Sequence, residues 1–99
     1  MSRPIVTLDD HDGIAVITLR RPERLNALSW PLVDRLHELL DHVAADRATR
    51  ALVLTGEGRG FCSGMDLHGD DAVGSADDVV PVYDRQEWLG KLAIKLRDL

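Results

Sequence analysis

The sequence has one cysteine, few aromatic residues and no long hydrophobic run. Cys62 has no second thiol to pair with, which excludes an intramolecular disulfide and a zinc site built from several cysteines. No apolar run approaches the ~20 residues of a membrane-spanning helix, so we expect no membrane contact. No basic start precedes an apolar run of about 7–15 residues, so we expect no secretory signal and predict a cytoplasmic location.

Basic residues are also scarce. The 12 Lys and Arg are outnumbered by 17 Asp and Glu and are dispersed, which argues against nucleic acid as a partner. A length of 99 residues allows one small domain at most. The apolar content of 44% is ordinary for a globular protein.

Two short β-branched segments near the N-terminus predict a β-hairpin. They cover residues 5–8 and 14–19, and a turn cluster ending in Gly13 separates them. Pro22 follows the second segment and should end it, because proline has no N–H to donate to a strand ladder.

The next segment has the spacing of an amphipathic helix. Ser29 is a suitable N-cap and Pro31 fits the first turn. Apolar side chains then recur at steps of three and four residues and predict one buried face. These are Leu32, Leu36, Leu39, Leu40 and Val43.

An apolar run without alternation, Ala51–Thr55, predicts a strand covered on both faces in a largely parallel sheet. Hairpin, helix and strand together form a ββαβ unit of an α/β fold. Residues 56–74 are rich in glycine and acidic residues, and we expect a functional loop there with a short helical turn. A last helix should start near Asp77 or Asp78. Its predicted apolar face consists of Trp88, Leu89, Leu92, Ala93, Leu96 and Leu99.

The loop that follows the predicted strand could carry chemistry. The segment Gly56–Gly60 lacks the Gly-Lys-Ser/Thr ending of a P-loop and the glycine spacing of a dinucleotide fingerprint, so we interpret it as a flexible connection. Phe61 could anchor the loop in the core. Gly64 permits a positive φ, and a short helix beginning after it would offer free N–H groups that can stabilise an oxyanion.

Other reactive side chains have simpler interpretations. His37 and His42 are five residues apart and do not share a helix face, so we expect two solvated surface histidines rather than a metal pair. Cys62 has no evident partner base and is interpreted as a small hydrophobe rather than a nucleophile. The acidic residues at 70, 71, 77 and 78 indicate a solvated loop rather than a metal site. We therefore predict no bound metal.

Three motifs resemble those of the enoyl-CoA hydratase/isomerase (crotonase-like) family, and they occur in the family's order. Arg21–Leu28 is similar to its Arg-Pro…Leu-Asn-Ala-Leu motif, Ala51–Gly56 to the strand that follows, and Phe61–Leu67 to its oxyanion loop. The likeness spans essentially all 99 residues. It implies the N-terminal ββαβ portion of a crotonase-like fold with an incomplete sheet, so that residues 1–99 form an N-terminal fragment of a single crotonase-like domain.

The resemblance also implies roles for individual residues. The backbone N–H of Met65 would be one of two donors to the carbonyl oxygen of an acyl-coenzyme A thioester, in a position where the family more often has alanine. The remaining implied coenzyme A contacts are Arg24, Ala27, Leu28, Ser63, Gly64, Asp66, Leu67 and His68. Coenzyme A would enter as part of the substrate, and no covalently bound cofactor is expected.

The family domain is more than twice as long, and its second oxyanion donor and catalytic carboxylates lie in parts that have no counterpart here. The resemblance thus implies a parent enzyme of fatty acid metabolism, a homotrimer or hexamer, with hydration of 2-enoyl-CoA as the favoured reaction. Isomerase, decarboxylase and dehalogenase members of the family share this N-terminal part, so those reactions stay open. We expect residues 1–99 alone to be inactive. The alternative is a non-catalytic remnant that binds coenzyme A or acts as an interaction module.

Overall fold

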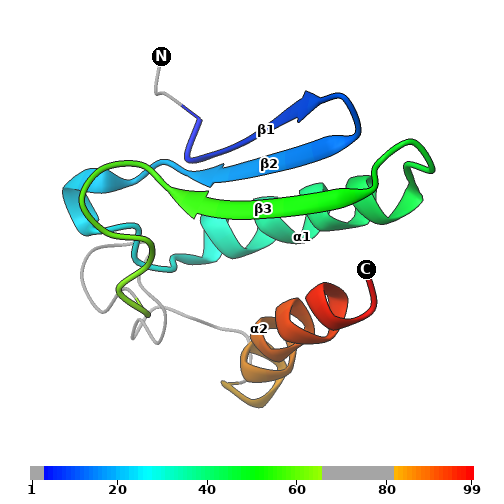
Figure 1. Cartoon of the computed structure of the whole chain (residues 1–99). Helices are drawn as coiled ribbons and strands as arrows, with labels where there is room; N and C mark the ends of the chain where they lie inside the picture. Colours follow the sequence, from blue (N-terminus) through cyan, green and yellow to red (C-terminus); the bar gives the residue numbers. More distant parts are fainter. Residues whose placement is uncertain (1–3, 66–81) are drawn as a thin grey trace.

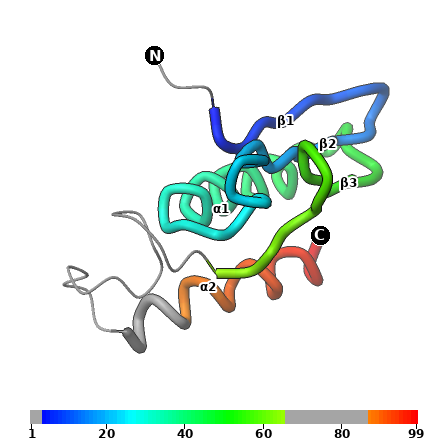
Figure 2. The backbone as a smooth tube through the Cα atoms, turned by 90° about the vertical axis from the view of Figure 1, so that its left-hand side faces the viewer, coloured from blue at the N-terminus to red at the C-terminus, as the bar shows by residue number. Residues whose placement is uncertain are grey.

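The computed structural model describes residues 4–65 and 82–99, with side chains in the second range described from Glu87 onward. The elements are β1 (Val6–His11), β2 (Ile14–Leu19), the 3-10 turn η1 (Pro22–Arg24), α1 (Trp30–Ala45), β3 (Ala51–Gly56) and α2 (Val82–Arg97). The three strands form one sheet in the order β1-β2-β3. Helix α1 lies along one face of the sheet, and α2 packs against α1 (Figure 1, Figure 2).

The predicted hairpin is confirmed. β1 and β2 pair antiparallel from Val6 opposite Leu19 to His11 opposite Ile14. The two turn residues, Asp12 and Gly13, have φ of 54° and 85°, which an Asp-Gly pair accommodates. β1 runs three residues beyond the predicted 5–8 segment, because pairing with the apolar β2 outweighs the low strand preference of aspartate.

The parallel arrangement is also confirmed. β3 pairs with β2 from Ile14 opposite Ala51 to Leu19 opposite Gly56, and α1 forms the crossover between them. The carbonyl of Gly13 accepts hydrogen bonds from the N–H groups of Arg50 (2.7 Å) and Ala51 (3.3 Å). These bonds tie the hairpin turn to the start of β3.

Helix α1 begins as the sequence predicts. The Ser29 side chain accepts from the Leu32 N–H at 3.4 Å, and Pro31 lies in the first turn. The predicted apolar face is buried in full, and Val33 and His37 are buried with it. This face packs on the inner side of the sheet, where Ala15, Ile17 and Leu19 are at most 2% exposed.

The outer face of the sheet differs from the prediction. Ala51, Val53 and Thr55 are exposed, with Val53 at 45%, so β3 is not covered on both faces by the part of the chain that the structure describes. The physical reason is that α1 covers the inner face only. The apolar run of β3 therefore predicted its parallel pairing correctly. It did not predict correctly that both faces of the strand are covered.

Helix α2 matches its predicted apolar face only in part. Leu92 is 8% exposed, and the half-buried Trp88 and Leu89 pack against the core. Leu96 and Leu99 are 37% and 46% exposed. α2 packs mainly against α1, so only a narrow strip of it is covered. The predicted start near residue 77 lies outside the described residues.

The prediction that His37 is a solvated histidine is wrong. Its side chain is 1% exposed, and its ring stacks on Trp88 with centroids 3.6 Å apart. The spacing of His37 and His42 excluded a shared metal site, but it could not show that α2 would cover one of them. His42 is exposed, as predicted.

Neither α1 nor the described α2 has the length and hydropathy of a membrane-spanning helix. Among the described side chains, those of residues 4–65 and 87–99, no three His, Cys, Asp or Glu residues cluster closely enough to hold a metal ion.

Candidate oxyanion loop and its supports

Two segments far apart in sequence run side by side at the end of the sheet. The Leu28 N–H donates to the Gly64 carbonyl at 2.6 Å, and the Ser63 N–H donates to the Leu25 carbonyl at 3.1 Å. Leu28 and Met65 form a parallel β-bridge. The fold thus brings the Arg21–Leu28 motif against the start of the Phe61–Leu67 motif.

This bridge fixes the direction of the Met65 peptide. In a parallel pair, one residue bonds to the two residues that flank its partner. Leu28 bonds to Gly64, the residue before Met65, so the N–H of Met65 itself points away from Leu28. Met65 is 43% exposed. Its N–H is therefore directed away from the supporting segment.

Gly64 gives the loop a conformation that other residues rarely adopt. Its φ is +103°, and an added Cβ would meet nothing within 4 Å. The requirement for glycine is therefore a backbone requirement rather than a matter of space. This conformation of Gly64 helps to set the orientation of the peptide group that joins Gly64 to Met65.

The other predicted site residues differ in their exposure. Arg24 is exposed at the end of η1, and Leu28 is half-buried. Ala27 is 7% exposed, and its carbonyl accepts from Arg21 Nη1 at 2.6 Å. Ala27 is thus largely enclosed by its own segment. Three further predicted residues, Asp66, Leu67 and His68, lie outside the described residues.

A shallow hollow of about 350 Å³ lies beside the loop. It is lined by Leu25, Arg59, Gly60, Phe61, Cys62 and Ser63. Phe61 is 53% exposed, so the prediction that it anchors the loop in the core is wrong for the described structure. Phe61 borders the hollow instead of joining the core cluster.

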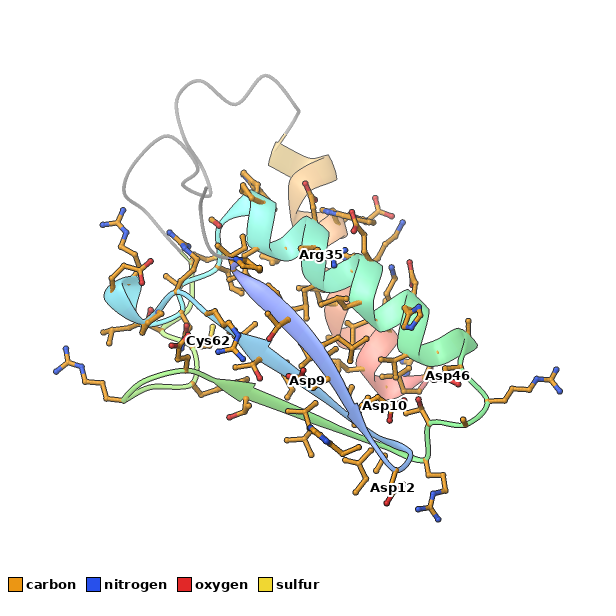
Figure 3. The ribbon with its side chains drawn as sticks, turned by 90° about the horizontal axis from the view of Figure 1, so that it is seen from above. Asp9, Asp10, Asp12, Arg35, Asp46 and Cys62 are labelled. Carbon is orange, nitrogen blue, oxygen red and sulfur yellow. The ribbon has the colours of Figure 1, made fainter. Side chains whose placement is uncertain are left out.

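Cys62 fits its interpretation as a small hydrophobe. It is half-buried and packs against the core. Figure 3 shows it at the end of the sheet opposite the hairpin turn that carries Asp12.

Sequence reasoning missed Asn26, whose side chain is fully buried beneath the loop. Its Oδ1 accepts from the Arg21 N–H at 2.7 Å. Its Nδ2 donates to the carbonyls of Glu57 (3.0 Å) and Gly60 (2.8 Å). The signal that could have found it is a short amide in a turn motif, because asparagine tolerates the left-handed conformation and can bond to nearby backbone.

Gly56 leaves room for that amide. A Cβ there would lie 2.7 Å from Asn26 Nδ2 and 2.4 Å from the Phe61 carbonyl oxygen. Half-buried Arg20 adds a second link, since it donates to Thr7 Oγ1 at 2.8 Å and pairs with Glu57 at 3.4 Å. The Asn26 amide and the Arg20–Glu57 pair therefore both hold the start of the loop after β3 in place.

Comparison with known proteins extends these observations. A family model described as enoyl-CoA hydratase/isomerase matches residues 9–92. An enoyl-CoA hydratase of Alternaria alternata is 39% identical over 90 residues, which covers 90% of this chain and 29% of that protein. The 1,2-epoxyphenylacetyl-CoA isomerase of Escherichia coli (strain K12) is 45% identical over 69 residues, covering 68% and 26%. The chain thus spans less than a third of these curated relatives.

Solved structures give the same result for the fold. A candidate enoyl-CoA hydratase from Streptomyces coelicolor A3(2) superposes with a TM-score of 0.82 at 38% identity, over 95% of this chain and 34% of that one. A monofunctional enoyl CoA isomerase from Mycobacterium smegmatis superposes with a TM-score of 0.59 at 44% identity, over 61% and 29%. The motif resemblance and the α/β fold are confirmed. The chain belongs to the enoyl-CoA hydratase/isomerase family.

Proposed function

We propose that this protein binds an acyl-coenzyme A thioester and that the Met65 N–H is one of two backbone donors to the thioester oxygen. The observation that carries the proposal is the Leu28–Met65 bridge, which directs this N–H away from the segment that supports it. A donor held in place before substrate binds needs little reorganisation when charge develops on the oxygen.

The reaction that fits best is the hydration of a 2-enoyl-CoA. The oxygen of water bonds to C3, and the π electrons move toward the thioester oxygen to give an enolate. The enolate then takes a proton at C2, so that one water is added in total. Backbone N–H groups stabilise the enolate oxygen, and carboxylates move the protons. The second donor and the carboxylates would come from other parts of the protein.

The coenzyme A portion would lie along both segments. Arg24 and Leu28 offer an exposed cation and a half-buried apolar side chain from one side, with Ala27 supporting them. Ser63 and Gly64 line the other side, and Asp66, Leu67 and His68 would continue it. A guanidinium suits a phosphate group because it can donate several charge-assisted hydrogen bonds. Met65 in place of the usual alanine would narrow the acyl pocket.

Isomerisation is the nearest other reaction, since the Escherichia coli relative bears an isomerase's name. It would develop negative charge on the same thioester oxygen and use the same Met65 donor, so these residues favour neither reaction over the other. The non-catalytic remnant is the alternative from another class. For the active protein we also propose a cytoplasmic homotrimer or hexamer, which light scattering and fractionation can test.

The test is a pair of measurements on the full-length protein. Calorimetry measures the dissociation constants of butyryl-CoA and of free coenzyme A, and so compares binding of the thioester with binding of coenzyme A alone. Loss of the enoyl absorbance of crotonyl-CoA measures hydration. Tighter binding of butyryl-CoA together with turnover supports the proposal. Binding without turnover of enoyl-CoA substrates favours the remnant, and absence of binding contradicts both.

A further inference from the structure

We infer that Asn26 is a positioning residue that sets the orientation of the Met65 N–H. This inference rests on the proposed function, because it assigns a second residue to the same oxyanion site. It concerns a side chain that is buried beneath the loop and does not border the hollow beside it.

The first argument is the set of hydrogen bonds that the Asn26 amide makes. Both N–H groups of Nδ2 are used, one on the Glu57 carbonyl and one on the Gly60 carbonyl. The carbonyl oxygen of the amide accepts from Arg21. One fully buried side chain therefore joins the segment before α1 to the loop after β3. A buried amide satisfied in this way fixes the relative positions of its partners.

The second argument is backbone strain at the same place. Leu25 and Asn26 have φ of 53° and 56°, in the left-handed region that side chains other than glycine rarely occupy. Two consecutive residues in this region persist only when the surroundings hold them. The Asn26 N–H supports the turn by donating to the Arg21 carbonyl at 2.8 Å. The side-chain amide adds a second bond across the same turn, because its Oδ1 accepts from the Arg21 N–H.

The third argument is the short path from Asn26 to the donor. On one side of Asn26, the Leu25 carbonyl accepts from Ser63, and two residues on, the Leu28 N–H donates to Gly64. Leu28 also forms the bridge with Met65. A shift of the turn would therefore rotate the peptide that carries the Met65 N–H.

The tight space around the amide explains why few substitutes would serve. The carbonyl oxygen of Gly60 lies within reach of Nδ2, and even a methyl group on Gly56 would come within 2.7 Å of that nitrogen. Aspartate has the same shape as asparagine but presents an acceptor to the carbonyls of Glu57 and Gly60. Asn26→Asp thus changes donors into acceptors with almost no change of volume.

The experiment compares Asn26→Asp and Asn26→Gly with wild type in the full-length protein. Glycine removes the amide without strain at positive φ, so it remains usable if the buried aspartate prevents folding. Val43→Ala, in the buried face of α1, is the control for a general loss of stability. Each variant is assayed for kcat with crotonyl-CoA and for the dissociation constant of butyryl-CoA. The infrared carbonyl stretch of bound butyryl-CoA labelled with ¹³C at the thioester is also recorded, because it reports hydrogen bonding to that oxygen.

We expect both Asn26 variants to lose about 10²-fold in kcat, the scale of an ångström-sized misplacement. The dissociation constant should change less than about threefold, and the carbonyl stretch should move back toward its value in water. Val43→Ala should keep the wild-type stretch. If a folded Asn26 variant keeps the wild-type carbonyl stretch and the wild-type kcat, the positioning role of Asn26 is overturned and the proposed function is not. Absence of a bound-state shift in wild type would instead overturn the proposed function.

Discussion

The ring of His37 stacks on the indole of Trp88, with the ring planes 20° apart, and this contact joins α1 to α2. His37 Nε2 also lies 2.8 Å from the Trp88 carbonyl oxygen. A carbonyl can only accept, so Nε2 carries a proton, and in the neutral ring Nδ1 then carries none. No side chain or backbone group among the described residues bonds to Nδ1, which is buried. Protonation would leave a buried Nδ1–H without an acceptor, so this site favours the neutral imidazole.

This requirement makes the packing of α2 sensitive to pH. Burial lowers the pKa of His37 below its ordinary value of 6.5, although its bond to the Trp88 carbonyl acts in the opposite direction. Lys95, whose ammonium lies 5.4 Å from the Trp88 ring, lowers it further, while Asp41 and Asp34 raise it. Above pH 6.5 the ring is neutral in both the folded and the unfolded state. Below it the unfolded state binds the proton more tightly, so stability falls with falling pH.

We therefore predict that the free energy of unfolding decreases by up to about 1.4 kcal/mol per pH unit below pH 6.5 because of this one group. His37→Gln in the full-length protein should remove that part of the slope, and His42→Gln, on the exposed side of the same helix, should keep it. Urea unfolding followed by circular dichroism between pH 7.5 and 5 measures both. An identical slope in His37→Gln and wild type would contradict the prediction.

Replacing Met65 by proline should remove the proposed oxyanion donor. We expect a loss of about 2.7–4 kcal/mol of transition-state stabilisation, measured as kcat of the full-length protein with crotonyl-CoA. Met65→Ala is the matched control, because it shortens the side chain and keeps the N–H. The assignment is wrong if the proline variant retains the wild-type kcat.

The space around Gly56 leads to a third prediction. Gly56→Ala would place a methyl group 2.4 Å from the Phe61 carbonyl oxygen, and crowding of this kind costs about 1–3 kcal/mol of folding free energy. Gly60→Ala, in the same loop, meets nothing within 4 Å and should be nearly neutral. Thermal unfolding of the two variants in the full-length protein compares them. Equal melting temperatures would show that the loop relaxes around the new methyl group.

The 99-residue chain on its own should not hydrate crotonyl-CoA, because we assign it one oxyanion donor and none of the catalytic carboxylates. It should also self-associate, since β3 pairs only with β2 among the described strands and its other edge can template pairing. Size-exclusion chromatography over a concentration series tests the association. Val53→Lys, on the exposed face of β3, should weaken it. Turnover by the isolated chain would refute the first part.

Much of the local structure follows from short-range chemistry. The Asp12-Gly13 turn, the Ser29 cap and the apolar spacing along α1 depend on neighbours within a few residues, and all three are as predicted. The parallel pairing of β3 follows from its apolar run and the helix before it. The motifs Arg21–Leu28 and Phe61–Leu67 were sufficient to suggest the family, and the family model matches residues 9–92.

Burial and orientation could not be obtained in the same way. The burial of His37 and of Phe61 was predicted from their own segments. Both predictions are wrong, because a different part of the chain decides whether each side chain is covered. The role of Asn26 depends on carbonyls that lie 31 and 34 residues away. The sequence by itself therefore determined the elements, their order and the family. Only the tertiary structure decided which polar groups are enclosed and where the Met65 N–H points, because both depend on contacts between segments that are distant in sequence.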